Sequence, residues 1–421
     1  MAQVAEASAA LEARVAPTLV DDGLGGTYIL HGQAGERLCV FKPRDEEPCA
    51  ENNPKASQQA FQASVGEGGM REGILVGEAA HNESAAYQLD ASERSAHFCR
   101  VPPTAVVRTE HSAFFDRQCG EGDSYFEAKA SPFRCRKEKV GSLQRFVESD
   151  GCADDFAPTL FPALEVQRIA ALDIRLYNCD RHGGNILVRF DRGGDPCASV
   201  SECPCELVPI DHGFCLPEAG TVLAGTLPQF EWRDWPQARM PMSADVAAYI
   251  SRIDVEADAA LLTGSGADAV DISPPTGLLA PPPPPGRVGA GGTSPGGGGP
   301  RLRDECVRTM RMGTLLLQCG ATGGLTLGEI ADIMCDEIDG ADANGAPITA
   351  FVLICRLADA EARAALAERG DAMCELRAAH ESTFLKALRR RLEQYIRALR
   401  SGDAAAVLGV GSAAAESMQI G

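Results

Sequence analysis

The sequence has few aromatic residues, little positive charge and no long apolar run. Aromatic side chains make up 5% of the 421 residues, although apolar residues reach 45%, enough for a sizeable core. Lysine and arginine number 39 against 59 acidic residues, and this formal charge of −20 argues against broad nucleic-acid binding. No run of about 18 apolar residues occurs, so we expect no membrane-spanning helix.

The cysteines do not form a recognisable framework either. Sixteen of them are scattered along the chain, and the first residues lack the basic start and long apolar stretch of a secretory signal. We therefore expect reduced thiols and a cytoplasmic protein. Cys203 and Cys205 are close together, but no second pair lies at the spacing of a zinc site, and we expect no zinc.

Residues 172–217 carry most of the chemistry that the sequence suggests. They read LDIRLYNCDRHGGNILVRF, then an irregular insert, then ELVPIDHGFCLP. Asn185 follows Asp180 by five positions, and Asp211 lies in an Asp-His-Gly turn. This spacing is typical of a phosphotransferase, in which one aspartate orients the attacking hydroxyl while the asparagine and a second aspartate hold a metal. The apolar runs on both sides of the insert predict two strands that bring Asn185 and Asp211 together.

A glycine-rich stretch near the N-terminus is a candidate for phosphate contact. Gly23, Gly25 and Gly26 precede two predicted strands, 27–30 and 38–41. Glycines without side chains let backbone N–H groups approach phosphates, although such a stretch is more often only a turn.

Lys42 ends the second of these strands. A lysine in this place can reach nucleotide phosphates, whereas the simpler interpretation is a solvated lysine on an edge strand. A helix is predicted around 79–89, and Glu83 near its middle is the carboxylate that could keep Lys42 aimed. A helix glutamate is usually just solvated, so this assignment depends on the other parts.

Two further pairs of residues have two interpretations each. Phe146 and Val147 end a short strand that could join two lobes and meet an adenine ring, but a buried strand without ligand contact is nearly as plausible. Trp232 and Trp235 either anchor a loop in the core or form an apolar lip for a lipid.

The C-terminal half is predicted to be helical. Ser243 and Thr326 are expected helix caps. The segment 384–399 has leucines on one side and Arg389, Arg390, Arg391 and Arg397 on the other. Such a helix can lie on an anionic membrane, but packing against the helical lobe is the interpretation that we favour.

These patterns divide the chain into six segments. They are an N-terminal tail (1–19), a first lobe (20–146), the first part of a second lobe (147–263), a Pro/Gly-rich flexible insert (264–300), further helices of the second lobe (301–400) and a C-terminal tail (401–421).

The sequence resembles the phosphatidylinositol 3- and 4-kinase superfamily, most closely the type II phosphatidylinositol 4-kinases and the plant gamma kinases. The resemblance rests on GLGGTYIL, VFKPRDEEP with NNPK, GEAAHNESAAYQLD, VPPTAVV, GSLQRFV, LDIRLYNCDRHGGNILV, LVPIDHGFCLP and FEWRDWPQA. These motifs cover roughly residues 20–262 in the family's order.

The resemblance implies an α+β, two-lobed kinase fold, with an antiparallel-sheet N-lobe and a mainly helical C-lobe. It implies transfer of phosphate from ATP, with Mg²⁺, to the 4-hydroxyl of phosphatidylinositol at a membrane surface. Catalysis is then expected at Asp180, with His182 as the other candidate base, and Mg²⁺ at Asn185 and Asp211. ATP is expected at the three glycines, at Lys42 with Glu83, and at Phe146 and Val147.

Three points set this chain apart or leave the function open. The stretch after NNPK has no cysteine, where type II lipid kinases often carry a palmitoylated cluster, so we expect no constitutive membrane anchor there. Peripheral binding to membranes is a separate alternative that stays open. We expect no ubiquitin-like domain ahead of the glycine stretch. A Ser/Thr protein kinase is the alternative function, and a pseudokinase that binds a partner is a further one.

Overall fold

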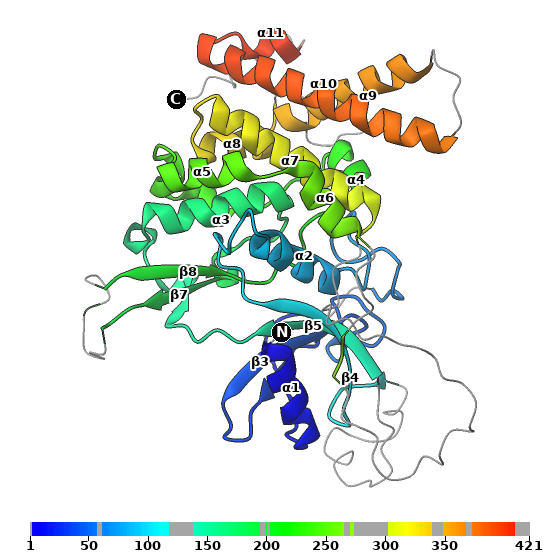
Figure 1. Ribbon diagram of the computed structural model, residues 1–421, viewed down its shortest axis with the longest axis vertical. Helices are drawn as coiled ribbons and strands as arrows, with labels where there is room; N and C mark the ends of the chain where they lie inside the picture. The colour runs from blue at the N-terminus through cyan, green and yellow to red at the C-terminus, as the bar shows by residue number, and fades with distance from the viewer. Residues whose placement is uncertain are drawn as a thin grey trace.

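The chain folds into a lobe built on a β-sheet and a lobe built of helices. The computed structural model describes residues 2–56, 61–117, 138–193, 199, 203–264, 270–272, 302–338, 348–367 and 373–408. Figure 1 shows strands β3, β4 and β5 at one end of the molecule, helices α9, α10 and α11 at the other, and α2 and α3 between them. The predicted two-lobed α+β architecture, with a sheet-based first lobe and a mainly helical second lobe, is confirmed.

The N-lobe sheet has six strands in the order β1-β2-β3-β5-β4-β9. Its members are β1 (Thr18–Leu19), β2 (Tyr28–His31), β3 (Arg37–Pro43), β4 (Thr104–Glu110), β5 (Glu138–Arg145) and β9 (Val270–Asp271). Neighbouring strands are antiparallel except β4 and β9, which are parallel. In the registers, Lys42 on β3 lies opposite Ser142 on β5.

The residues expected to form an N-terminal tail belong to the N-lobe core. Helix α1 (Ala2–Glu12) buries Val4, Ala7 and Leu11 in a cluster with Tyr28 and Phe41 of the sheet. Alanine favours the helix, and burial of its apolar side chains holds it on the sheet. The prediction of a tail over 1–19 was wrong, because its few larger apolar residues lie on one helix face.

Strand β9 lies inside the stretch predicted as a Pro/Gly-rich flexible insert over 264–300. Its pairing with β4 places Ile272 in the N-lobe core, so this part of the insert is sheet. The Pro/Gly-rich residues 273–300 lie outside the described residues. The chain is next described at Leu302, which is buried in the C-lobe core beside Leu262.

The C-lobe is a group of helices around a large apolar core. Its helices are α3 (Ala163–Leu176), α4 (Ala219–Ala224), α5 (Ala244–Arg252), α6 (Val255–Thr263), α7 (Asp304–Thr322), α8 (Leu327–Cys335), α9 (Ala350–Ala367), α10 (Met373–Ser401) and α11 (Ala404–Leu408). Helix α2 (Ala79–Ala91) joins the same core through Ala85, Ala86 and Leu89, which links the two lobes. Residues 404–408, predicted as part of a tail, instead form α11 with Leu408 buried.

Both predicted caps are present. Ser243 Oγ accepts a hydrogen bond from the N–H of Val246 at the start of α5. Thr326 and Glu329 form a reciprocal capping box at the start of α8.

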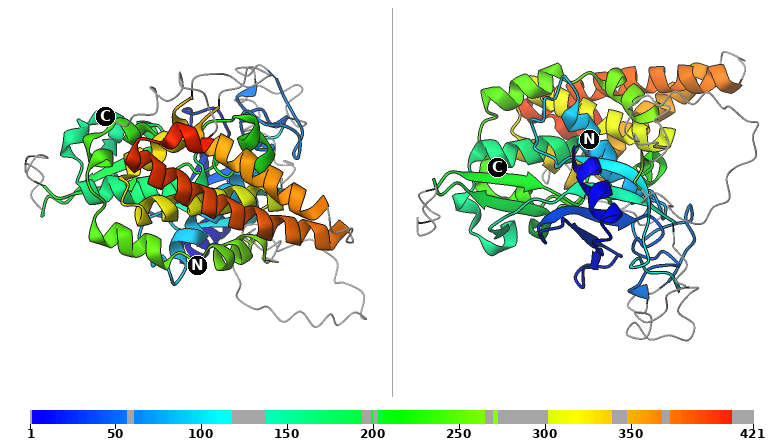
Figure 2. Two further views of the ribbon diagram at one scale, coloured as in Figure 1. Left: turned by 90° about the horizontal axis from the view of Figure 1, so that it is seen from above. Right: turned by 60° about the horizontal axis from the view of Figure 1, so that its bottom comes forward.

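The arginine-rich C-terminal helix packs against its neighbours. Leu388, Leu392 and Ile396 of α10 are buried, and Arg390 pairs with Glu361 of α9. Figure 2 shows α9 and α10 lying side by side. The favoured prediction of packing is confirmed. Within the part of the chain that the structure describes, no helix combines the length and apolar character needed to cross a bilayer.

A small second sheet carries the segment of greatest interest. Its strands β6 (Gly151–Cys152), β7 (Ile186–Phe190) and β8 (Cys205–Pro209) are antiparallel neighbours in this order. The register pairs Ile186 with Pro209, as expected from the two apolar runs. The residue before β7 and the residues after β8 therefore lie together.

Candidate active site

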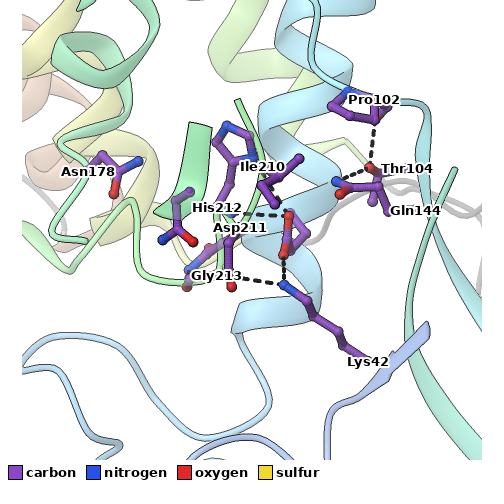
Figure 3. Close-up of polar contacts among 12 residues, drawn as sticks. Lys42, Pro102, Thr104, Gln144, Asn178, Ile210, Asp211, His212 and Gly213 are labelled. Atoms are coloured by element: carbon purple, nitrogen blue, oxygen red, sulfur yellow. Dashed lines mark hydrogen bonds and ion pairs between the residues drawn. The ribbon is translucent and has the colours of Figure 1, made fainter. Parts of the chain in front are cut away.

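Lys42, Glu83 and Asp211 meet at the end of strand β3. The Nζ of Lys42 lies 2.7 Å from Oε1 of Glu83 and 3.0 Å from Oδ1 of Asp211 (Figure 3). The expected pairing of Lys42 with Glu83 is therefore present, and Asp211 is a second partner. Burial alone would raise the pKa of Glu83, but Lys42 and His212 outweigh burial and lower it. Likewise, desolvation opposes the charge of Lys42, yet the two carboxylates raise its pKa.

Helix α2 is fixed so that Glu83 stays in this place. At its start, the carboxylate of Glu47 accepts a hydrogen bond of 2.7 Å from the N–H of Gly77. One residue before Glu83, the Nδ2 of Asn82 donates to the carbonyls of Gly213 (3.0 Å) and Cys215 (2.8 Å). The helix is thereby tied directly to the segment that carries Asp211.

Asp180, Asn185 and Asp211 are brought together as their spacing predicted. The N–H of Ile210 donates to the carbonyl of Asn185 at 3.0 Å, directly before Asp211. The Nδ2 of Asn185 donates to the carbonyl of Asp180 at 2.9 Å, which leaves its Oδ1 as the amide atom for another ligand. Asp211 has a left-handed backbone with φ +54°, a strained conformation held by the contacts on both sides.

A buried ionic network under this segment sets its shape. Asp173 of α3 accepts hydrogen bonds from Nε of Arg181 at 3.0 and 3.1 Å, from Nε1 of Trp232 at 2.9 Å and from Nδ2 of Asn178 at 3.0 Å. Asn178 also accepts the N–H of Asp180 through its Oδ1, at 2.9 Å. The carboxylate of Asp173 thus organises the chain on both sides of Asp180.

Arg181 extends the same network to Asn185 and to Ile210, the residue before Asp211. Its Nη1 donates to the carbonyl of Asn185 at 2.5 Å and to that of Ile210 at 2.7 Å. The arginine is completely buried, so its charge depends on Asp173 for compensation.

The glycine stretch forms the turn between β1 and β2. Gly23 has a left-handed backbone with φ +77°, and the N–H of Gly26 donates to the carbonyl of Glu46 at 2.8 Å. A Cβ on Gly26 would lie 2.2 Å from Oε2 of Glu46, so a side chain does not fit there. Lys55 holds the other part of the turn by donating from Nζ to the carbonyls of Asp22 and Gly23.

Phe146 and Val147 follow β5 on the way to the C-lobe, and both are half-buried. The N–H of Phe146 donates to the carbonyl of Leu38 at 2.9 Å, and the Arg37 guanidinium lies 4.3 Å from the centre of its ring. Gln144, two residues earlier, is buried and donates to Oγ1 of Thr104 at 3.0 Å (Figure 3). The strand end is therefore fixed beside the site, and contact of Phe146 and Val147 with adenine remains a prediction.

His182 and Asp180 differ in their surroundings. His182 is exposed, and its ring lies against Gly184, while its N–H donates to the carbonyl of Asp180 at 3.0 Å. The carboxylate of Asp180 is held by Arg71, whose Nη2 lies 2.5 Å from Oδ1.

The two tryptophans are core residues. Trp232 is 0% exposed and Trp235 is 5% exposed, and Trp235 packs against Phe161 with ring centres 5.0 Å apart. The alternative of an apolar lip for a lipid is wrong, because neither ring reaches the surface.

Several residues of the site were missed from the sequence. Asp173 lies in a helix that is predicted from the spacing of its apolar residues, and that pattern takes no account of the carboxylate among them. Glu47 belongs to the run DEEP, which reads as a polar loop although its last acid caps α2. Arg71 lies in a glycine-containing stretch with no pattern that points to Asp180. For Asp173 a signal existed, since an acidic residue among buried apolar neighbours needs partners.

The arrangement of the two lobes, with an ion pair of a strand lysine and a helix glutamate beside the Asp180–Asn185 segment, defines the kinase fold class. A family model described as phosphatidylinositol 3- and 4-kinase matches residues 23–273. The chain belongs to this family.

Curated relatives cover most of the chain. The chain is 36% identical over 343 residues to phosphatidylinositol 4-kinase gamma 4 of Arabidopsis thaliana, and the aligned region covers 79% of this chain and 49% of that protein. For phosphatidylinositol 4-kinase gamma 4 of Oryza sativa subsp. japonica the identity is 37%, over 76% of this chain and 45% of that protein. For phosphatidylinositol 4-kinase gamma 8 of Arabidopsis thaliana the identity is 42%, over 62% of this chain and 44% of that protein. The chain thus spans about half the length of the curated relatives that it matches.

Proposed function

We propose that this chain transfers the γ-phosphoryl group of ATP to the 4-hydroxyl of the inositol ring of phosphatidylinositol. The observation that carries the proposal is the meeting of Lys42, Glu83 and Asp211 beside Asp180 and Asn185, joined by the hydrogen bond from Ile210 to the Asn185 carbonyl. The names of the relatives, which are phosphatidylinositol 4-kinases, support the choice of acceptor. Because that acceptor is a lipid, we place the reaction at a membrane surface.

Lys42 is the cation for the nucleotide phosphates. Its ammonium has Glu83 on one side and Asp211 on the other, so its position is fixed before a nucleotide binds. The glycine turn, with Gly23, Gly25 and Gly26, would lie against the phosphates. The N–H of Gly25 would be the donor, because the N–H of Gly26 already donates to the carbonyl of Glu46 and that of Gly23 to the carboxylate of Asp22. Phe146 and Val147 would form part of the adenine wall.

Asn185 and Asp211 suit Mg²⁺. The free amide oxygen of Asn185 and the carboxylate of Asp211, which is partly exposed, are oxygen donors of the kind that Mg²⁺ prefers. When bound there, Mg²⁺ would neutralise charge on the phosphates.

Asp180 orients the acceptor hydroxyl and takes its proton. The hydroxyl oxygen then forms a bond to the γ-phosphorus as the bond from that phosphorus to the β–γ bridging oxygen breaks, and ADP leaves. His182 is the alternative base, since it is exposed two residues away.

The proposal is tested with two variants and a matched control. Asp180→Asn and Asp211→Ala should each lower phosphorylation of phosphatidylinositol by roughly 10²–10⁴-fold while circular dichroism stays unchanged. Asp234→Asn removes an exposed carboxylate and should leave the rate unchanged. Radiolabelled ATP is offered with phosphatidylinositol vesicles and, in parallel, with a generic protein substrate. Labelling of the protein alone would refute the lipid acceptor, and full activity in both site variants would refute the mechanism.

A further inference from the structure

Arg71 approaches the proposed catalytic carboxylate from a turn of the N-lobe. Residues 68–75 form this turn, closed by an antiparallel bridge between Gly68 and Leu75. The Nη2 of Arg71 lies 2.5 Å from Oδ1 of Asp180, which is on the other lobe. The turn therefore places a positive charge beside Asp180, the carboxylate proposed to orient the acceptor hydroxyl.

The position of this turn is set by the C-lobe. The carbonyl of Gly73 accepts hydrogen bonds from the N–H of Glu218 at 2.9 Å and from Nη2 of Arg303 at 3.1 Å. Arg303 also pairs with Glu78 and Glu218. Gly73 itself has φ +80°, and a Cβ there would lie 2.1 Å from Oγ1 of Thr221. The turn is thus held in one place, and Arg71 with it.

The guanidinium of Arg71 has capacity for a second anion. Its side chain is 39% exposed, and its buried Nε has no hydrogen-bond partner among the described residues. The ring of Phe214 lies on its other side, 5.8 Å from the guanidinium carbon. A guanidinium offers five N–H donors in a fork that matches phosphate oxygens.

Lys42 and Arg71 face different parts of the site. Lys42 is engaged by Glu83 and Asp211, whereas Arg71 touches Asp180, the residue proposed to receive the acceptor hydroxyl. The acceptor lipid is an anion, and a chain with a formal charge of −20 needs a local cation to accept it beside two aspartates.

We propose that Arg71 binds the phosphodiester of the inositol lipid and is the specificity-determining residue for an anionic acceptor. In the acceptor-free protein its guanidinium holds Asp180. When the headgroup enters, the guanidinium transfers to the phosphodiester and leaves the Asp180 carboxylate to the ring hydroxyl. This inference rests on the proposed function.

The test compares Arg71→Gln and Arg71→Lys with a matched control. Arg108→Gln removes an equal charge from a surface ion pair with Glu138 on β4 and β5. In mixed micelles, Arg71→Gln should raise the KM for phosphatidylinositol by about 10- to 100-fold. Its KM for ATP should stay unchanged. Arg71→Lys should recover part of the loss, and Arg108→Gln should resemble the wild type.

An unchanged KM for the lipid would overturn the assignment. If kcat rose at the same time, the contact with Asp180 would be a simple block.

A second measurement needs no kinase activity. Isothermal titration calorimetry of the wild type should detect glycerophosphoinositol, which carries the phosphodiester, more strongly than myo-inositol, and Arg71→Gln should abolish the difference. Equal binding of the two compounds by the wild type would refute the role of Arg71. If the wild type fails to phosphorylate phosphatidylinositol at all, the proposed function fails, and this titration alone decides the role of Arg71.

Discussion

Replacing Asp173 by asparagine should destabilise the protein more than any exposed substitution. Asp173 and Arg181 are both completely buried. Asparagine has no charge to compensate the guanidinium, and its NH₂ group would replace one of the two oxygens that accept hydrogen bonds. Removing one partner of a buried ion pair costs about 3–5 kcal/mol, because the remaining charge is left without compensation. The free energy of unfolding of a typical domain is only about 5–15 kcal/mol, so the loss should be evident in urea unfolding followed by far-UV circular dichroism.

Two further variants separate the ion pair from simple hydrogen bonding. Trp232→Phe removes the 2.9 Å bond to Asp173 and, because the indole is fully buried, part of the core packing as well. It should cost at least about 1.5–3 kcal/mol. The double variant Asp173→Asn/Arg181→Met removes both charges. Its loss of unfolding free energy should be smaller, by about 2 kcal/mol, than the sum of the losses of the single variants Asp173→Asn and Arg181→Met. Additive losses, or an Asp173→Asn variant within about 1 kcal/mol of the wild type, would refute the reasoning.

Two other predictions concern helix starts. Burial raises the pKa of Glu47 from 4.5 to about 8, against the backbone N–H donors of α2 that lower it. Between pH 4.5 and about 8, Glu47 keeps its proton in the folded chain and loses it in the unfolded chain. The free energy of unfolding should therefore fall as pH rises, by up to about 1.4 kcal/mol per pH unit. Urea unfolding at several pH values in that range should show the slope, and Glu47→Gln should reduce it; an identical slope in the variant would exclude Glu47 as its source. Thr326→Ala removes the side-chain half of the capping box with Glu329 and should cost about 1 kcal/mol without changing the KM for ATP, whereas an altered KM would contradict a purely local role.

The residues within and beside the Asp180–Asn185 segment could be predicted from the sequence, because their spacing and the flanking apolar runs are local. Lys42 and Glu83 could be paired only by assuming the kinase order of elements, and the structure places them in contact. Arg71 could not be predicted, since its contact with Asp180 joins residues 109 positions apart. No local propensity encodes such a contact.

The errors at the chain's margins have a different cause. Alanine-rich and Pro/Gly-rich stretches carry little periodic signal, so a packed helix at 2–12 and a two-residue strand at 270–271 were not predicted as part of the N-lobe. Both are held by tertiary burial, which overrides weak local preference. For the tryptophans the choice between core and surface also depended on neighbours far away in the sequence, such as the Asp173 carboxylate.

Strand β9 makes the backbone pass between the lobes three times. The chain goes from β5 to β6, returns from α6 to β9, and passes again from Ile272 in the N-lobe core to Leu302 in the C-lobe core. The two lobes are therefore joined covalently at more than one place, so a hinge motion between them has to be compatible with each connection. Cutting the chain between Ile272 and Leu302 would remove one connection and leave two fragments that each retain part of the C-lobe core. Such a nicked protein should stay assembled, because Leu302 and the helices after it are buried in the same apolar core as α3 and α5.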